Sequence, residues 1–178
     1  NAVIPFGVGV DIGCRMALSI YDIPELFYYE NEAKFKRELV AHSKFGAGHG
    51  FQGQYKSNHE VLDRNEFAEH TFIKNLKDKA WSQLGSSGGG NHFVEFGIIE
   101  FATDDAALNI PKGKYVALLT HSGSRGFGAT IAGHYTKIAK ETCKLPEVAR
   151  NLAYLDLGSD LGQEYWIAMN LAGEYASA

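Results

Sequence analysis

Cysteine is nearly absent from this sequence of 178 residues, which contains only Cys14 and Cys143. Two cysteines cannot build the disulfide framework of a small secreted domain, so we expect a protein of the reducing cytoplasm. A long hydrophobic run is missing too, because no stretch approaches the roughly 20 apolar residues that a membrane-spanning helix needs. These absences argue against a disulfide scaffold and against a membrane protein, and they predict a soluble domain.

Basic residues are missing from the last part of the chain. Residues 153–178 contain four of the 21 acidic residues and none of the 17 Lys and Arg residues. The formal charge of −4 therefore arises there, and the first 152 residues are neutral. A neutral body neither predicts nor excludes a basic groove for nucleic acid. Hydrophobic residues make up 45% of the chain and charged residues 21%, which is typical of a globular protein with a core.

The pattern mixes strands and helices without a regular alternation. Strands are predicted over residues 2–10, 16–21, 93–101 and 115–120, and helices over residues 31–43, 60–83, 127–144 and 163–178. This order predicts an α+β fold with mixed or antiparallel sheets and flanking helices. Predicted core contacts of the second helix are Phe67, Phe72, Ile73 and Leu76. Because the last helix has no stop signal and the chain opens within a strand, we expect residues 1–178 to be one domain segment of a longer protein, truncated at both ends.

The segment Lys44–His59 is a predicted loop, KFGAGHGFQGQYKSNH. Its glycines suggest mobility, and aromatic residues alternate with them. A loop of this length favours a function over a plain connection.

Four potential metal ligands lie where strands meet turns. Asp11 and Cys14 are three residues apart in a glycine-flanked turn, His92 follows a glycine run, and His121 ends an apolar strand. A carboxylate, a thiolate and two imidazoles form a competent set for a divalent transition metal, and Zn²⁺ is the ion that the Cys/His/His part favours. Taken singly, a cysteine is more often a small buried apolar residue and a histidine more often bonds to the backbone.

The stretch HSGSRG, His121–Gly126, lies between a predicted strand and a predicted helix. The backbone N–H groups and the helix dipole at such a turn favour an anion, and Arg125 adds a planar fork that suits phosphate oxygens. The alternative is a plain glycine turn with a solvated arginine. The stretch does not match a Walker A loop, which needs a lysine after its last glycine.

The stretch LGSSGGGNHFVEFG, Leu84–Gly97, places a glycine run directly before a histidine and a strand. Strand alternation puts Asn91, Phe93 and Glu95 on one side, and His92 and Val94 on the other. An amide, an aromatic face and a carboxylate suffice to hold a nucleobase or a sugar. The alternative is a partly exposed strand with Glu95 in solvent.

The motifs DxxC (Asp11, Cys14), GGGNHxxE (Gly88 to Glu95) and HSGSRG, in this order, resemble the RtcB family of RNA ligases from Val8 to about Ala176. The resemblance implies an RtcB-like fold and the joining of RNA that ends in a 2′,3′-cyclic phosphate or a 3′-phosphate to RNA with a 5′-hydroxyl end. It also implies GTP and one or two Mn²⁺ ions as cofactors, and tRNA halves or broken RNA ends as partners.

The resemblance carries over residue by residue. It implies that Asp11, Cys14, His92 and His121 bind metal, with the cysteine bridging two Mn²⁺ ions, and that Arg125 binds phosphate. It further implies a guanylate-contacting strand made by Asn91, His92, Phe93, Val94 and Glu95. The glycine run then allows the backbone to approach the nucleotide and metals, because no Cβ stands in the way. Mn²⁺ follows from the resemblance alone, whereas the ligand chemistry favours Zn²⁺.

Two departures from the family pattern matter. After Cys14 the chain reads Arg15-Met16-Ala17 where the best-known members have Gly-Val-Arg, which suggests a divergent branch, one for RNA repair and not for tRNA splicing. The nucleotide-accepting histidine, another metal-binding histidine and a C-terminal lysine of the family have no match. We therefore assign no catalytic nucleophile and expect the segment alone to be inactive. The histidines outside the motifs are poor substitutes: His42, His49, His59, His70 and His134.

Two other function classes remain open from the sequence. A metal-dependent hydrolase would use the same ion to activate water, and a non-catalytic module would bind a nucleotide or RNA without chemistry. A covalent GMP adduct would separate the ligase from both.

Overall fold

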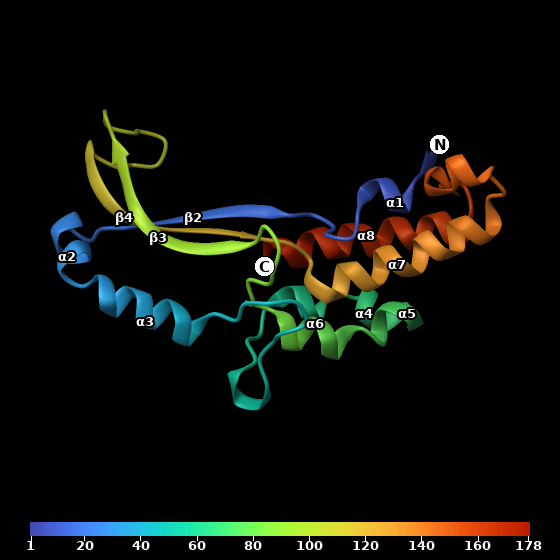
Figure 1. Ribbon diagram of the computed structural model, residues 1–178, viewed down its shortest axis with the longest axis horizontal. Coiled ribbons are helices and arrows are strands. Elements are labelled where there is room, and N and C mark those ends of the chain that lie inside the picture. Colours follow the sequence, from blue (N-terminus) through green and yellow to red (C-terminus); the bar gives the residue numbers. More distant parts are fainter.

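The computed structural model describes residues 1–178. Figure 1 shows a body of packed helices from which a curved three-stranded sheet extends to one side. All strand pairs are antiparallel and the helices flank them, so the predicted α+β class is confirmed.

The three-stranded sheet has β4 (Gly113–Ser122) in its centre, between β2 (Arg15–Tyr21) and β3 (Phe93–Phe101). His121 of β4 lies opposite Met16 of β2 and opposite Phe93 of β3. The beginnings of β2 and β3 and the end of β4 therefore meet at one end of the sheet. This register brings the three predicted motifs together, although they are far apart in the sequence.

Two helices lie along the sheet, α2 (Glu25–Glu30) and α3 (Glu32–His42), as Figure 1 shows. The ring of Phe35 in α3 makes an edge contact with Phe96 of β3, with 5.0 Å between the ring centroids. The Tyr28 hydroxyl donates a hydrogen bond to the Phe96 carbonyl at 3.3 Å. The predicted helix over residues 31–43 is confirmed, and its Phe35 packs on the sheet.

The helical body is built on α7 (Arg125–Thr142) and α8 (Asp160–Ser177), which lie side by side in Figure 1. Ser159 begins α8, because its hydroxyl accepts a hydrogen bond from the Gly162 N–H at 3.1 Å. Fully buried side chains between these helices include Phe127, Ile131, Tyr165 and Leu171. The body also contains α4 (Glu66–Glu69), α5 (Thr71–Lys74), α6 (Lys77–Gln83) and the 3₁₀ turns Glu60–Asp63 and Glu147–Leu152.

The single helix predicted over residues 60–83 is wrong. The chain forms a 3₁₀ turn and then α4, α5 and α6, because His70 has extended backbone angles (φ −103°, ψ 113°) that no helix continues through. The breaks fold the segment back on the body. The predicted core contacts Phe67, Ile73 and Leu76 are buried, and Phe72 packs against the core from a partly buried position.

The strand predicted over residues 2–10 is also wrong beyond Val3. β1 (Ala2–Val3) pairs with β5 (Leu155–Asp156), and α1 (Pro5–Val8) follows directly. Pro5 is the first residue of α1, where its missing N–H has no helical partner to lose and its fixed φ suits a helix. No helix of the molecule is long and apolar enough to cross a membrane.

Candidate metal centre

The Asp11–Cys14 turn is held in place by two close backbone approaches. Gly13 has a φ of +71°, and a Cβ there would lie 2.8 Å from the Gly173 Cα of α8. A Cβ on Gly123 would lie 2.1 Å from the Asp11 Oδ1. Only glycine fits both positions, so the turn packs on α8 and directs Asp11 toward the end of β4.

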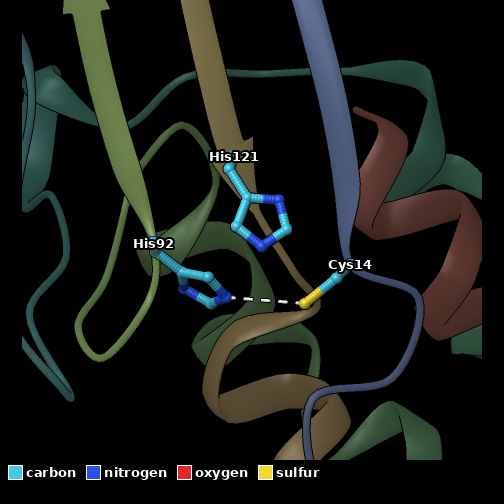
Figure 2. Close-up of side chains that lie close together, drawn as sticks. All are labelled: Cys14, His92 and His121. Atoms are coloured by element: carbon cyan, nitrogen blue, oxygen red, sulfur yellow. Dashed lines mark hydrogen bonds between the residues drawn. The ribbon is translucent and has the colours of Figure 1, made fainter.

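Cys14, His92 and His121 point toward one another, as Figure 2 shows. Their potential ligand atoms all lie within 4.8 Å of one another, and the Cys14 Sγ is 3.6 Å from the His92 Nε2. Asp11 joins this group, because its Oδ2 lies 3.0 Å from the Cys14 Sγ and 2.5 Å from the His92 Nε2. The structure thus brings all four predicted ligand residues together.

The Cys14 thiol is protonated at neutral pH in this environment. Burial raises its pKa from 9.0 to about 11, and the hydrogen bond to Asp11 and the negative charge of that carboxylate act in the same direction. The positive charges of Arg125 and Arg15 oppose this shift. A divalent cation stabilises a coordinated thiolate directly, so metal binding here would release the Cys14 proton.

A hydrogen bond to a backbone carbonyl fixes the tautomer of His121. Its Nδ1 lies 3.1 Å from the Arg15 carbonyl, which only accepts, so Nδ1 carries the proton. The Nε2 therefore keeps its lone pair, and the Asn91 amide donates to it at 3.5 Å. A carbonyl behind the remote ring nitrogen is the usual partner of a metal-binding histidine. This arrangement fits a divalent ion at the His121 Nε2.

These features raise the question of which known proteins share them. The profile of the family described as “tRNA-splicing ligase RtcB” matches residues 27–178. The chain belongs to the RtcB family.

Three relatives show the extent of the similarity. “RNA-splicing ligase RtcB homolog 1” of Entamoeba dispar is 24% identical over 99% of this chain and 38% of the relative. “tRNA-splicing ligase RtcB” of Nanoarchaeum equitans is 28% identical over 99% of this chain and 43% of the relative. “tRNA-splicing ligase RtcB” of Methanococcus maripaludis is 36% identical over 62% of this chain and 24% of the relative. The chain spans about two fifths of the length of the relatives that align with all of it.

His92 of this RtcB-family chain is held in a different tautomer from His121. The Arg125 Nη1 lies 3.0 Å from the His92 Nδ1, and a guanidinium only donates, so Nδ1 accepts and Nε2 carries the proton toward Asp11. A metal on the His92 Nε2 needs the opposite tautomer. Asp11 and His121 therefore fit the ion as they stand, whereas Cys14 fits it once its thiol loses the proton and His92 once Arg125 moves off the ring.

Arg125 enters the network over the glycine run. It has a φ of +54°, an uncommon angle for a residue other than glycine, and its Nε donates to the Ser86 hydroxyl at 3.3 Å. A Cβ on Gly88 would lie 1.8 Å from the Arg125 Nη1, so the guanidinium lies where only glycine leaves space. The alternative of a solvated arginine is wrong. A cavity of about 340 Å³ beside Arg125 is also lined by Arg15, Ser86 and Ser122 and by no acidic residue.

The beginning of α7 offers fewer free backbone donors than the sequence suggests. The Gly126 N–H donates to the Gln83 Oε1 at 2.9 Å. The Arg125 side chain, more than the helix end, is therefore the group that can reach an anion.

The predicted side of β3 is arranged around His121. Phe93 lies opposite His121 in the sheet, with 5.8 Å between the ring centroids, and Glu95 is two residues further along the same face. Val94 pairs with Thr120 on the other face. The predicted placement of His92 on the same side as Val94, opposite Asn91, is wrong because β3 begins only at Phe93. His92 and Asn91 both contact the cluster from the preceding turn.

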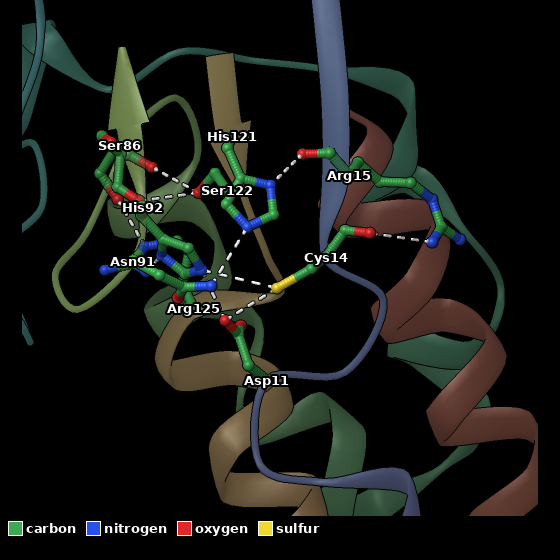
Figure 3. A network of polar contacts seen from close by, with 10 residues as sticks. Asp11, Cys14, Arg15, Ser86, Asn91, His92, His121, Ser122 and Arg125 are labelled. Atoms are coloured by element: carbon green, nitrogen blue, oxygen red, sulfur yellow. Dashed lines mark hydrogen bonds and ion pairs between the residues drawn. The ribbon is translucent and has the colours of Figure 1, made fainter.

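Several members of the network in Figure 3 are not predicted by the sequence. Ser122 donates to the Ser87 carbonyl at 2.8 Å. Next to this network, outside the residues of that figure, Gln83 of α6 accepts a hydrogen bond from the Gly126 N–H. Arg15 takes part through its carbonyl. A backbone group leaves no side-chain signal, and the glutamine stands in no motif, so only the serine inside HSGSRG could have been suspected.

Proposed function

We propose that this chain is the metal- and phosphate-binding part of an RNA ligase. The ligase would join RNA that ends in a 2′,3′-cyclic phosphate or a 3′-phosphate to RNA with a 5′-hydroxyl end, using GTP and Mn²⁺. The observation that carries the proposal is the convergence of Asp11, Cys14, His92 and His121 at one end of the sheet, in a chain of the RtcB family. Because the chain spans about two fifths of its relatives, the activity is proposed for the longer protein, and residues 1–178 are proposed as one domain of it.

One or two metal ions would be held by Asp11, Cys14, His92 and His121. A bound divalent ion supplies Lewis-acid stabilisation of the charge on phosphate oxygens. Imidazole and thiolate alone would favour Zn²⁺, and the Asp11 carboxylate makes the set more suitable for a harder ion such as Mn²⁺. The chain's own contribution is to fix the ligand positions through the Asp11–Cys14 turn and the Arg15 carbonyl.

The guanine nucleotide would lie along β3, beside the metals. Phe93 offers an aromatic face next to His121, Asn91 offers an amide, and Glu95 is exposed on the same face. A carboxylate accepts hydrogen bonds from the N–H groups of guanine, which supports GTP over ATP. The proposed nucleotide-contacting residues also include His92 of the preceding turn and Val94, whose side chain lies on the other face of β3.

Arg125 would orient a phosphate of the RNA. It carries a fixed charge, it lies beside the metal ligands, and the adjoining cavity has no acidic lining. Release of Arg125 from His92 on metal binding would make its guanidinium available for bidentate contact with phosphate oxygens.

No residue of this chain is proposed to accept GMP. Two of the histidines outside the cluster have other contacts: His59 accepts from the Val61 N–H, and His134 stacks on Phe72 with 4.0 Å between ring centroids. The segment alone is therefore expected to bind metal and phosphate without joining RNA. Both cysteines are free thiols, which supports the reducing cytoplasm as its location.

The test is incubation of the longer natural protein with Mn²⁺, labelled GTP and RNAs of defined ends. A covalent GMP adduct and joined RNA are expected. Hydrolysis of RNA without an adduct would favour a metal-dependent hydrolase, and RNA binding without either reaction would favour a non-catalytic module.

A further inference from the structure

The loop Lys44–His59 is tied to the glycine run of the metal centre by backbone hydrogen bonds. The Gly46 N–H donates to the Gly88 carbonyl at 2.7 Å, and the Ser87 N–H donates to the Lys44 carbonyl at 2.9 Å. Gly88 is also the residue over which Arg125 lies. The start of the loop is therefore fixed beside the cluster.

A second attachment fixes the loop to α6. The Phe51 N–H donates to the Ser82 carbonyl at 2.6 Å. A Cβ on Gly50 would lie 2.4 Å from the same carbonyl oxygen, so glycine permits the close approach. In Figure 1 the segment after α3 runs toward α6, and part of it projects as a loop from the helical body. The loop and α6 thus form one continuous surface that begins at the metal centre.

This surface is depleted of negative charge. The chain has 21 acidic residues, yet none falls within Lys44–His59 or within the segment from Lys79 to Val94 to which the loop is bonded. Lys56 lies over the Trp81 ring of α6, with its Nζ 4.1 Å from the ring centroid. The surface therefore carries ammonium groups with few acidic side chains to neutralise them, since Asp78 in the first turn of α6 is the acidic residue of its segments.

The same surface exposes aromatic side chains. Tyr55 is 71% exposed, Phe45 is 41% exposed and Trp81 is 36% exposed. Aromatic faces interleaved with lysines are the combination that binds single-stranded nucleic acid, because unpaired bases stack on the rings and the ammonium groups contact phosphates. Duplex RNA hides its base faces, and an acidic peptide has none, so neither would use the rings.

We propose that the surface formed by Phe45, Tyr55, Lys56 and Trp81 binds the unpaired nucleotides of an RNA end and leads them toward the metal centre. The proposal rests on the proposed function, which makes RNA the substrate. It adds a binding site that lies outside the four predicted ligand residues, the β3 contacts and Arg125.

The test measures binding of a fluorescently labelled, unstructured 12-nucleotide RNA to this chain by fluorescence anisotropy. EDTA is present, so that the metal centre plays no part. We expect Tyr55→Ala and Trp81→Ala each to weaken binding about fivefold or more, because each removes a stacking face, whereas Tyr55→Phe retains binding. Lys56→Ala should lower the slope of log Kd against log salt by about 0.7, the value for one phosphate contact to a single strand.

Matched controls come from α2 and α3, outside the proposed surface. Tyr29 of α2 is 56% exposed and Lys36 of α3 is exposed, so Tyr29→Ala and Lys36→Ala remove similar groups and should leave binding unchanged. Equal RNA binding by wild type, Tyr55→Ala and Trp81→Ala would overturn the proposed surface. Competition by duplex RNA or by polyglutamate that is as strong as competition by unlabelled single-stranded RNA would overturn it too. Such a result would not affect the ligase proposal, because that proposal is tested by the covalent GMP adduct. Conversely, absence of the GMP adduct would refute the ligase proposal without changing the effect of Tyr55→Ala and Trp81→Ala on RNA binding in EDTA.

Discussion

Replacement of Gly88 by alanine tests whether the glycine run exists to admit Arg125. A Cβ at this position would lie 1.8 Å from the Arg125 Nη1 and 2.0 Å from its Cζ. The guanidinium is the far end of a flexible side chain, so it can swing away and let the protein fold. The Arg125 contacts with His92 at 3.0 Å and with Ser86 at 3.3 Å would then be lost.

The expected loss of stability has two parts. Gly88 has a φ of +99°, and forcing alanine into such a conformation costs about 1–3 kcal/mol. Loss of the charge-assisted hydrogen bonds of Arg125 adds about 1.5–3 kcal/mol. Gly9 isolates the first part, because its φ is +91° and a Cβ there would have nothing within 4 Å.

Urea unfolding, followed by circular dichroism, measures both variants. Gly88→Ala should lose about 1.5–3 kcal/mol more of its unfolding free energy than Gly9→Ala, the contribution of the Arg125 hydrogen bonds. In an Arg125→Ala background this difference should vanish, since no guanidinium remains to be displaced. Equal losses for Gly88→Ala and Gly9→Ala in the wild-type background would refute the reasoning.

Three further predictions concern the cluster and its neighbours. Arg125→Ala should weaken phosphate binding by about 1.5–3 kcal/mol while metal binding persists, and Arg125→Lys should restore phosphate binding only in part because an ammonium lacks the planar fork. Isothermal titration with inorganic phosphate and with Mn²⁺ measures both affinities. Parallel loss of metal and phosphate binding would mean that the turn is structural. The stability of the metal-free chain should fall as pH rises from about 9 toward 11, because the Cys14 pKa is raised to about 11 when folded and the unfolded thiol loses its proton first. Cys14→Ser should make this fall smaller, and the remainder comes from buried tyrosines such as Tyr135 and Tyr165, whose pKa burial raises to about 12. A profile unchanged by Cys14→Ser would contradict the assigned environment. Cys14 should react slowly with iodoacetamide at neutral pH in EDTA, and rapid alkylation would show a thiolate where we place a thiol.

The sequence singles out the residues that converge in the cluster because each lies at a chemically distinct boundary. Cys14 ends a glycine-flanked turn, His92 follows a glycine run and His121 ends a strand, so all three are visible as motifs. Their convergence depends on the strand order β2-β4-β3, which no local pattern specifies. The resemblance to a family, more than the spacing of the residues, made that convergence predictable.

Long-range contacts account for what the sequence could not predict. The break at His70 follows from packing of Phe67 and Ile73 against the body, whereas the local pattern alone favours one helix. The approach of Arg125 over Gly88 joins residues 37 positions apart. The loop Lys44–His59 is recognised as a loop by its glycines, but its attachment to Gly88 and Ser82 is made by backbone groups that carry no sequence signal.

The most direct test of the metal centre is the absorption spectrum of the chain titrated with Co²⁺, which reports a sulfur ligand through a charge-transfer band in the near ultraviolet. We expect this band in the wild type and not in Cys14→Ser. His121→Gln should bind cobalt more weakly, and Cys143→Ser, which alters the only other cysteine, should leave the band unchanged. A wild-type chain that binds no cobalt, or a band that survives in Cys14→Ser, would contradict the claim that Cys14, His92, His121 and Asp11 form a metal site.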